Sequence, residues 1–376
     1  MKAFFEGISS RISRGREAID RRRRFNSTQP TPFAYDEEPT ITITPAPIQY
    51  DATINNYEVN ASDDGENRRQ HQEAERDVDM MYCLARSDAW LARHGLTVLH
   101  WSVSCLPLPI DVFNALIARD PDMVNVLDRS GNLPLHIACS HHAPAEVIHA
   151  LIQTNPKTCS VRDGSGFCAL HILCDLGCST ESLRAALRVL LQSTEGATIL
   201  AKKDYVFGRT PLNILNQRKN LTMFTSCVES LRALRQRERD AILCGNWKES
   251  DRMKLATRMN EAKEMEFWCK ARLLILAEYA LCRRNGAIRN SLDDFNDHDI
   301  IQACLGVKEC PLSLLEYVLL VYDKELFMKD RNGDLPLHQA CANSKELTDK
   351  QRIIAEVLLA NPKAARVTNG SGRLPL

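Results

Sequence analysis

A four-residue motif, Leu-Pro-Leu-His, occurs at residues 133–136 and again at residues 335–338. Reduced forms of it occur as Thr-Pro-Leu at residues 210–212 and as Leu-His at residues 99–100 and 170–171. In each place the motif follows shortly after a glycine. A chain that repeats one motif in register builds a row of similar units, each packed on its neighbours, rather than one single core.

The units share an internal pattern. Their opening glycines are 36, 35 and 42 residues apart, at Gly95, Gly131, Gly166 and Gly208. Turn-forming residues stand beside these glycines, and glycine accepts the positive φ of a tight turn. Proline then fits the first turn of a helix, where its missing N–H is not needed. A second amphipathic helix follows, with apolar residues at helical spacing such as Val147, Ile148, Leu151 and Ile152.

These units resemble ankyrin repeats, whose signature is a unit of about 33 residues that begins Thr-Pro-Leu-His-x-Ala. The resemblance covers roughly residues 80–215 and 295–376 and is carried by several copies of the motif in register. It implies an all-α fold, an ankyrin-type α-solenoid of stacked helix-turn-helix repeats with short hairpin-like turns. It also implies a concave surface of turn tips and inner helices that grips other proteins.

Composition and pattern together divide the chain into five parts. We expect a basic arm, a disordered acidic linker, ankyrin-like repeats, a helical insertion packed on the solenoid, and further repeats of which the last is truncated. These parts span residues 1–24, 25–77, 78–215, 216–294 and 295–376.

The first two parts differ in charge. Residues 1–24 hold eight basic and three acidic residues, whereas residues 33–79 hold twelve acidic and three basic. Residues 25–76 are rich in Pro, Thr, Asn and Asp and bury too little apolar surface to offset their ordering entropy, which predicts disorder. The apolar residues of the arm have helical spacing, which predicts a marginal tail helix. A nuclear signal in the arginines at residues 21–24 and a membrane-surface or targeting helix stay open.

The insertion, residues 216–294, predicts a helical pair. A charged helix is expected at about residues 228–243, followed by a break at Gly245 and Asn246. A longer helix is then expected from Ser250 to about residue 284. Its apolar stripe indicates packing into the solenoid, in place of part of one repeat.

The repeat pattern resumes near Asn296 without its opening glycine. Residues 300–304 align with residues 135–139, and residues 314–320 predict the second helix of that unit. Residues 372–376 begin another unit and stop before its histidine. Because a solenoid normally ends in a polar capping repeat, we expect the natural chain to continue.

Two patterns superficially suggest chemistry. Cys168, His171, Cys174 and Cys178 share a helix face and have the side chains that bind zinc. Other repeats place His and Cys at the positions of His171 and Cys174, however, and one rigid helix cannot surround an ion, so we predict no metal. The Asp-Gly-Ser-Gly at residues 163–166 lacks the Gly-Lys-Ser/Thr ending of a phosphate loop, so we predict no cofactor.

The motif histidines are His100, His136, His171 and His338. In ankyrin repeats this histidine hydrogen-bonds near the hairpin and steadies the turn, and the resemblance implies the same role here. A catalytic role would need a base or nucleophile at a fixed spacing, and none recurs. We therefore predict no catalytic residue and no enzymatic activity.

The resemblance also assigns the partner-binding residues, which are those at the turn tips. By position they are Asp128, Arg129, Ser130, Asn132, Arg162, Asp163, Arg331, Asn332 and Asp334. They mix both charges, so complementarity would provide specificity. The net charge of the whole chain is zero, and acidic residues alternate with the arginines at residues 232–239, so no nucleic-acid partner is expected.

Fourteen cysteines without a signal peptide indicate a reducing compartment, the cytoplasm or the nucleus. No apolar run reaches the ~18–20 residues of a membrane span. We therefore expect a monomeric scaffold or adaptor for protein partners that the sequence does not name. Two alternatives stay open, a nuclear regulator that uses the basic arm and the non-catalytic part of a longer enzyme.

Overall fold

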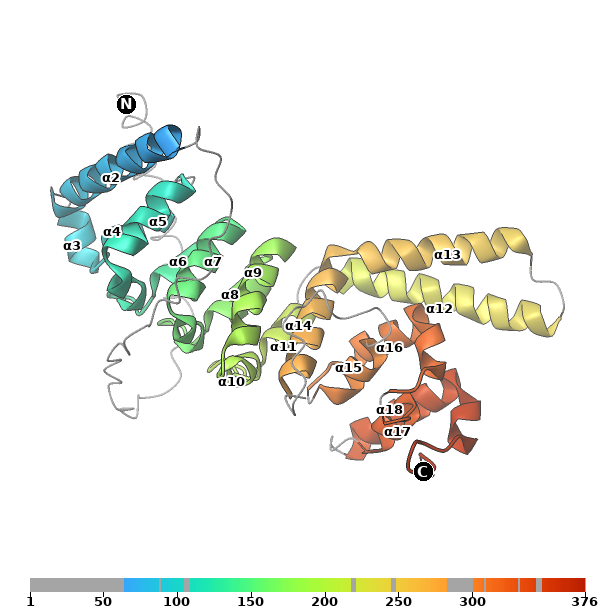
Figure 1. Ribbon diagram of the computed structural model, residues 1–376. Helices are drawn as coiled ribbons and strands as arrows, with labels where there is room; N and C mark the ends of the chain where they lie inside the picture. The colour runs from blue at the N-terminus through green and yellow to red at the C-terminus, as the bar shows by residue number, and fades with distance from the viewer. Residues whose placement is uncertain are drawn as a thin grey trace. The chain divides into compact units, whose positions relative to one another are not determined.

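A computed structural model describes most of the chain after residue 63. The described residues are 64–87, 89–104, 109–217, 221–244, 248–282, 300–307, 309–330, 332–342 and 347–375. In this part all regular secondary structure is helical (Figure 1), and the extended backbone makes one isolated bridge, between Arg162 and Cys168. The predicted all-α class is confirmed, whereas the basic arm and the linker up to residue 63 lie outside the described residues.

The chain divides into two compact units, residues 1–120 and 121–376. The first contains α2 (Asp64–Ser87), α3 (Ala89–His94), α4 (Val98–Ser104) and α5 (Ile110–Arg119). Helix α2 packs against α5 and buries Ala74, Val78 and Met81, which are spaced four and three residues apart. The expectation of disorder is therefore wrong for residues 64–77, because the few apolar residues there share one helix face.

The second unit consists of helix pairs arranged in two layers. The first helices of the pairs are α6 (Pro134–Ser140), α8 (Ala169–Leu176), α11 (Pro211–Asn216), α15 (Ile300–Gly306) and α17 (Pro336–Ala342). The second helices are α7 (Ala145–Thr154), α9 (Thr180–Gln192), α16 (Leu312–Val321) and α18 (Leu347–Ala360). First helices pack on first helices (α6 on α8, α8 on α11, α15 on α17), and second helices on second helices (α7 on α9, α16 on α18).

Prolines begin several first helices, as predicted, and also follow the ends of several second helices. Pro134, Pro211 and Pro336 begin first helices, and the second helices α5, α7 and α18 end just before another proline. The prolines that follow the second helices each begin a short 3₁₀ helix: η1 (Pro121–Asn125), η2 (Pro156–Ser160) and η6 (Pro362–Arg366). The same turn forms without proline at η5 (Asp323–Phe327).

The described residues of the insertion form three helices rather than two: α12 (Leu221–Leu243), α13 (Glu249–Glu264) and α14 (Glu266–Cys282). The long helix expected after Ser250 is interrupted at Met265, whose ψ of 127° is extended. Helices α12 and α13 form an antiparallel pair (Figure 1). Helix α14 packs against α9, α11, α15 and the short α10 (Gly196–Leu200), so it fills the place of the second helix after α11.

An aromatic cluster fixes the insertion to α16. Phe224, Phe267, Trp268, Tyr317 and Tyr322 lie with neighbouring ring centroids 4.7–6.0 Å apart. The Trp268 Nε1–H donates to the Tyr322 hydroxyl at 3.0 Å, and the Tyr317 hydroxyl donates to a backbone carbonyl of α13 at 2.6 Å. Aromatic contacts of this kind add stabilisation beyond the area they bury, so the insertion is an integrated part of the second unit.

The arginines of α12 also face α16. Arg232 lies 3.1 Å from Glu316, and Arg235 lies 2.9 Å from Asp323 and also bonds to the carbonyl of Leu320. The Arg235 side chain is only 15% exposed. Arg235 also pairs with Glu238 on the same helix at 2.7 Å, so the acidic partners of these two arginines come both from α12 and from α16 and η5, which lie far away in sequence.

Candidate functional site

The candidate site is the row of turn tips that precede the first helices. We define five tips, at residues 128–132, 163–167, 204–209, 330–334 and 369–373. Each contains a glycine with the predicted positive φ, and we name the tips after these glycines: Gly131, Gly166, Gly208, Gly333 and Gly372.

Four of the five tips, all except the Gly208 tip, are closed by one side-chain oxygen. In the Gly131 tip, Asp128 Oδ1 accepts hydrogen bonds from the backbone N–H groups of Ser130 and Asn132, both at 2.8 Å. The Asp128 N–H donates in turn to the Asn132 carbonyl at 2.8 Å. The same pair of side-chain bonds recurs at Asp163, Asp330 and Asn369. This oxygen satisfies backbone donors that a tight turn otherwise leaves unpaired.

Successive tips touch one another through backbone. A Cβ added to Gly164 would lie 2.0 Å from the carbonyl oxygen of Ser130, and the Gly370 N–H donates to the Asn332 carbonyl at 3.1 Å. The glycines at these two positions are needed because the neighbouring tip occupies the space of a side chain. This contact gives a structural reason for the Gly-Ser-Gly sequence that superficially suggested a phosphate loop.

The motif histidines fasten three first helices, α6, α8 and α17, to the segment around the following tip. His136 Nδ1 accepts from the Leu133 N–H at 3.0 Å, so Nε2 carries the hydrogen and donates to the Val161 carbonyl at 3.1 Å. The same two bonds recur at His171, with Cys168 and Lys202, and at His338, with Leu335 and Arg373. The predicted turn-steadying role is confirmed, and the bond to the next unit is an addition that the motif did not predict.

Burial shifts the pKa values of two side chains near the Gly166 tip. It lowers the pKa of His171, despite backbone acceptors that favour the charged form, and it raises the pKa of the Cys168 thiol. Both ring nitrogens of His171 are engaged with backbone groups. Among the described residues, no group of three His, Cys, Asp or Glu side chains is placed to hold a metal ion.

Four of the residues predicted to contact a partner use their side chains in hydrogen bonds within a tip or between neighbouring tips. Asp128 and Asp163 are only 5% exposed, and their carboxylates accept hydrogen bonds from the backbone of their own tips. The Asn132 amide donates to Asp128 at 3.1 Å, and Asp334 accepts from the Asn369 amide at 2.8 Å. These side chains shape the surface rather than project from it.

The other predicted residues vary in exposure. Arg129 and Asn332 are exposed, whereas Ser130 and Arg162 are half-buried. Arg331 lies outside the described residues. The structure therefore brings Arg129 and Ser130 together on the Gly131 tip, next to the Gly166 tip, and contact of this row with a partner stays a prediction.

The Gly208 tip differs from the other tips, and the sequence prediction missed it. It exposes Tyr205 by 63%, Val206 by 40% and Phe207 by 65%. The Arg162 guanidinium carbon lies 3.7 Å from the Tyr205 ring centroid, and that of Arg209 lies 4.2 Å from the Phe207 ring centroid. Two large aromatic residues just before the tip glycine, where other tips have Arg, Gly, Ser or Asn, are the signal that could have identified it.

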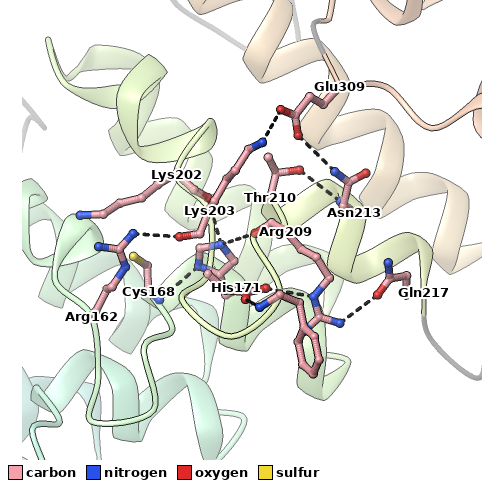
Figure 2. A network of polar contacts seen from close by, with 12 residues as sticks. Arg162, Cys168, His171, Lys202, Lys203, Arg209, Thr210, Asn213, Gln217 and Glu309 are labelled. Carbon is pink, nitrogen blue, oxygen red and sulfur yellow. Dashed lines mark hydrogen bonds and ion pairs between the residues drawn. The ribbon is translucent and has the colours of Figure 1, made fainter. Parts of the chain in front are cut away.

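A polar network holds this tip in place (Figure 2). Arg209 Nε lies 3.0 Å from Asp204, and Arg209 Nη1 donates to the Gln217 amide oxygen at 2.8 Å. Burial raises the pKa of Asp204, but the Phe207 N–H and Arg209 outweigh that effect, so the pKa lies below its ordinary value. Asp204 is therefore ionised at neutral pH and fixes Arg209 under the exposed ring.

The network also reaches Glu309, which lies between α15 and α16. Lys203 Nζ lies 2.8 Å from Glu309, whose second oxygen accepts from the Asn213 amide at 3.4 Å. Asn213 stands on α11 at the position where α6, α8 and α17 have the motif histidine. Its shorter amide side chain thus joins an ion pair instead of bonding to a following tip.

Sequence comparison assigns no family. No protein-family model and no curated protein matches this chain. Among the described residues, no helix is long and apolar enough to cross a membrane. What the chain does must therefore be argued from the tips themselves.

Proposed function

We propose that this chain is a non-catalytic scaffold or adaptor, a divergent ankyrin-type α-solenoid that binds partner proteins along its turn tips. The recurrence of tip, first helix and second helix supports the ankyrin-type assignment. The proposed setting is the cytoplasm or the nucleus, as the use of cysteine indicates.

The single observation that carries the proposal is that the tips are held in shape by their own hydrogen bonds and by contacts with neighbouring tips. In four of the five tips, two backbone N–H groups are satisfied by an Asp or Asn side chain of the same tip. Backbone contacts at Gly164, Tyr205 and Gly370 join three pairs of neighbouring tips. The exposed residues Arg129, Tyr205 and Phe207 are therefore presented on a rigid row. A prearranged surface loses little entropy when it binds a protein, which favours recognition.

The histidines support the non-catalytic part of the proposal. At His136, His171 and His338, Nδ1 accepts from backbone and Nε2 faces a carbonyl, and all three residues are buried. Histidines held in this way stabilise the repeat, and they are not positioned to exchange protons with a substrate.

The test is partner capture by proximity labelling with the full chain in cells. The rim variant carries Arg129→Glu and Arg373→Glu, which reverse exposed charges on two tips without removing a described hydrogen bond of either guanidinium. The matched control carries Arg237→Glu and Arg239→Glu, two exposed arginines on α12. We expect partner proteins to be lost with the rim variant and kept with the control, at equal helicity by circular dichroism. Equal partner sets from both variants would contradict the scaffold reading.

A further inference from the structure

The Gly208 tip presents an aromatic surface that is already ordered before any partner arrives. Tyr205 is covered on one face by Arg162, whose Nη2 donates to the Lys203 carbonyl at 2.9 Å. Phe207 is covered by Arg209, which Asp204 holds. Each ring therefore has one face fixed against a guanidinium while most of its surface remains in water.

Backbone packing specifies the position of Tyr205. The Tyr205 N–H donates to the Gly166 carbonyl at 3.4 Å, and a Cβ added to Gly166 would lie 2.8 Å from Tyr205 Cβ. The neighbouring tip thus supports the exposed ring from below. Tyr and Arg are the residue types most enriched among those that dominate protein–protein binding energy, and here they occur together on a supported turn.

The charged side chains near this surface indicate the charge of the partner. Arg209 and Lys203 are paired with Asp204 and Glu309. By contrast, the hydrogen bonds of Arg162 and Lys202 end on neutral backbone carbonyls. Arg162 Nη2 donates to the carbonyl of Lys203, the neighbour of Lys202, and Lys202 Nζ donates at 2.6 Å to that of Ser160, two residues before Arg162, so the two cations lie near each other (Figure 2). Two neighbouring positive charges thus have neutral acceptors, beside exposed aromatic rings.

We infer that the Gly208 tip is a docking site for an acidic peptide segment of a partner protein. Carboxylates of that segment would bind at Arg162 and Lys202, and an adjacent apolar side chain would pack on Tyr205 and Phe207. The inference rests on the proposed scaffold function and names the class of partner for one tip. A nucleic acid fits less well, because two of the four nearby basic side chains, Arg209 and Lys203, already have acidic partners and a polyanion gains affinity from many phosphate contacts.

The test is selection of a random peptide library, displayed on phage, against the immobilised full chain. The site variant carries Tyr205→Ser and Phe207→Ser. The matched control carries Ile242→Ser and Met253→Ser, which remove exposed apolar side chains on α12 and α13. All four positions are exposed, so both variants should retain the wild-type melting temperature, and this is measured first.

We expect wild type and control to enrich peptides in which Asp or Glu flanks an apolar residue. The best such peptide, measured by fluorescence anisotropy, should bind the site variant at least about tenfold more weakly. Lys202→Gln should weaken binding less and should reduce its salt dependence, because one charge contact is lost.

Four results would overturn the inference: no enrichment on wild type, enriched basic peptides, equal binding by the site variant, or a single-stranded oligo(dT) probe that binds wild type more tightly than any selected peptide. Self-association of wild type that the site variant abolishes would assign the surface to a second copy instead. The scaffold proposal is tested separately, because partners lost with the Arg129→Glu, Arg373→Glu variant but kept with Tyr205→Ser, Phe207→Ser would refute only the inference about this tip.

Discussion

His171 Nε2 lies 3.0 Å from the carbonyl oxygen of Lys202, a residue 31 positions later in the chain. The same ring accepts a hydrogen bond from the Cys168 N–H at its other nitrogen. One imidazole therefore caps its own helix and joins that helix to the next unit. Because the ring is fully buried, neither partner can exchange this bond for water.

Replacing His171 by Ala should destabilise the chain strongly. The substitution leaves the Cys168 N–H and nearby carbonyls without their partner in a buried place and opens a cavity. We expect a loss of about 3–5 kcal/mol in the free energy of unfolding. Urea denaturation followed by circular dichroism measures it, and His149→Ala, at a half-buried position of α7, is the control that should cost about 1 kcal/mol or less.

The same histidine makes stability depend on pH. Its pKa is lowered on folding, so below its ordinary value of 6.5 the folded state binds fewer protons than the unfolded state. Its contribution should be complete above about pH 6.5 and should decline as pH falls through the folded pKa. Denaturation of wild type and of His171→Gln at pH 8, 7, 6 and 5 should show a steeper decline for wild type. Parallel curves would mean that His171 does not titrate in this way.

Local rules explain which parts of the fold could be predicted. The tip glycines, the prolines that begin first helices and the ends of second helices follow from backbone constraints that act within a few residues. The break at Met265 and the folded state of residues 64–77 depend on contacts between distant helices, such as the packing of α14 on α9 and of α2 on α5. No local signal marks the break at Met265, because helical spacing continues through it. Residues 64–77 do have helical spacing, but their polar composition predicts disorder until the contact with α5 is known.

The positions of the tips could be predicted from the sequence, but the exposure of their individual side chains could not. The motif located the tips, yet the carboxylates of Asp128 and Asp163 proved to be buried. A turn aspartate that bonds to backbone two and four residues later is a structural element, and sequence position alone does not separate it from a contact residue. Tyr205 and Phe207 were missed because their tip is longer than the others and does not align with them.

The contact between neighbouring tips predicts a steric requirement at Gly164. A methyl group there would meet the Ser130 carbonyl at 2.0 Å, so Gly164→Ala must push the two tips apart. We expect a loss of about 1–3 kcal/mol. Gly208→Ala separates backbone strain from this clash, because its φ is positive but nothing lies within 4 Å of an added Cβ. Thermal unfolding should show the Gly208 variant losing only about 1 kcal/mol.

The aromatic cluster beneath the insertion provides the last prediction. Tyr322→Phe removes the hydroxyl that accepts from Trp268 Nε1–H, and Trp268 is fully buried, so its donor is left without that acceptor. Tyr317→Phe removes a donor to the carbonyl of Ala262, which still accepts from the Met265 N–H at 3.3 Å. We therefore expect Tyr322→Phe to cost about 1–3 kcal/mol and Tyr317→Phe about 1 kcal/mol. Urea unfolding monitored by tryptophan fluorescence compares the two variants directly. If Tyr317→Phe proved the more damaging, the bond to α13 would be what holds the insertion against α16, and the tryptophan bond would be secondary.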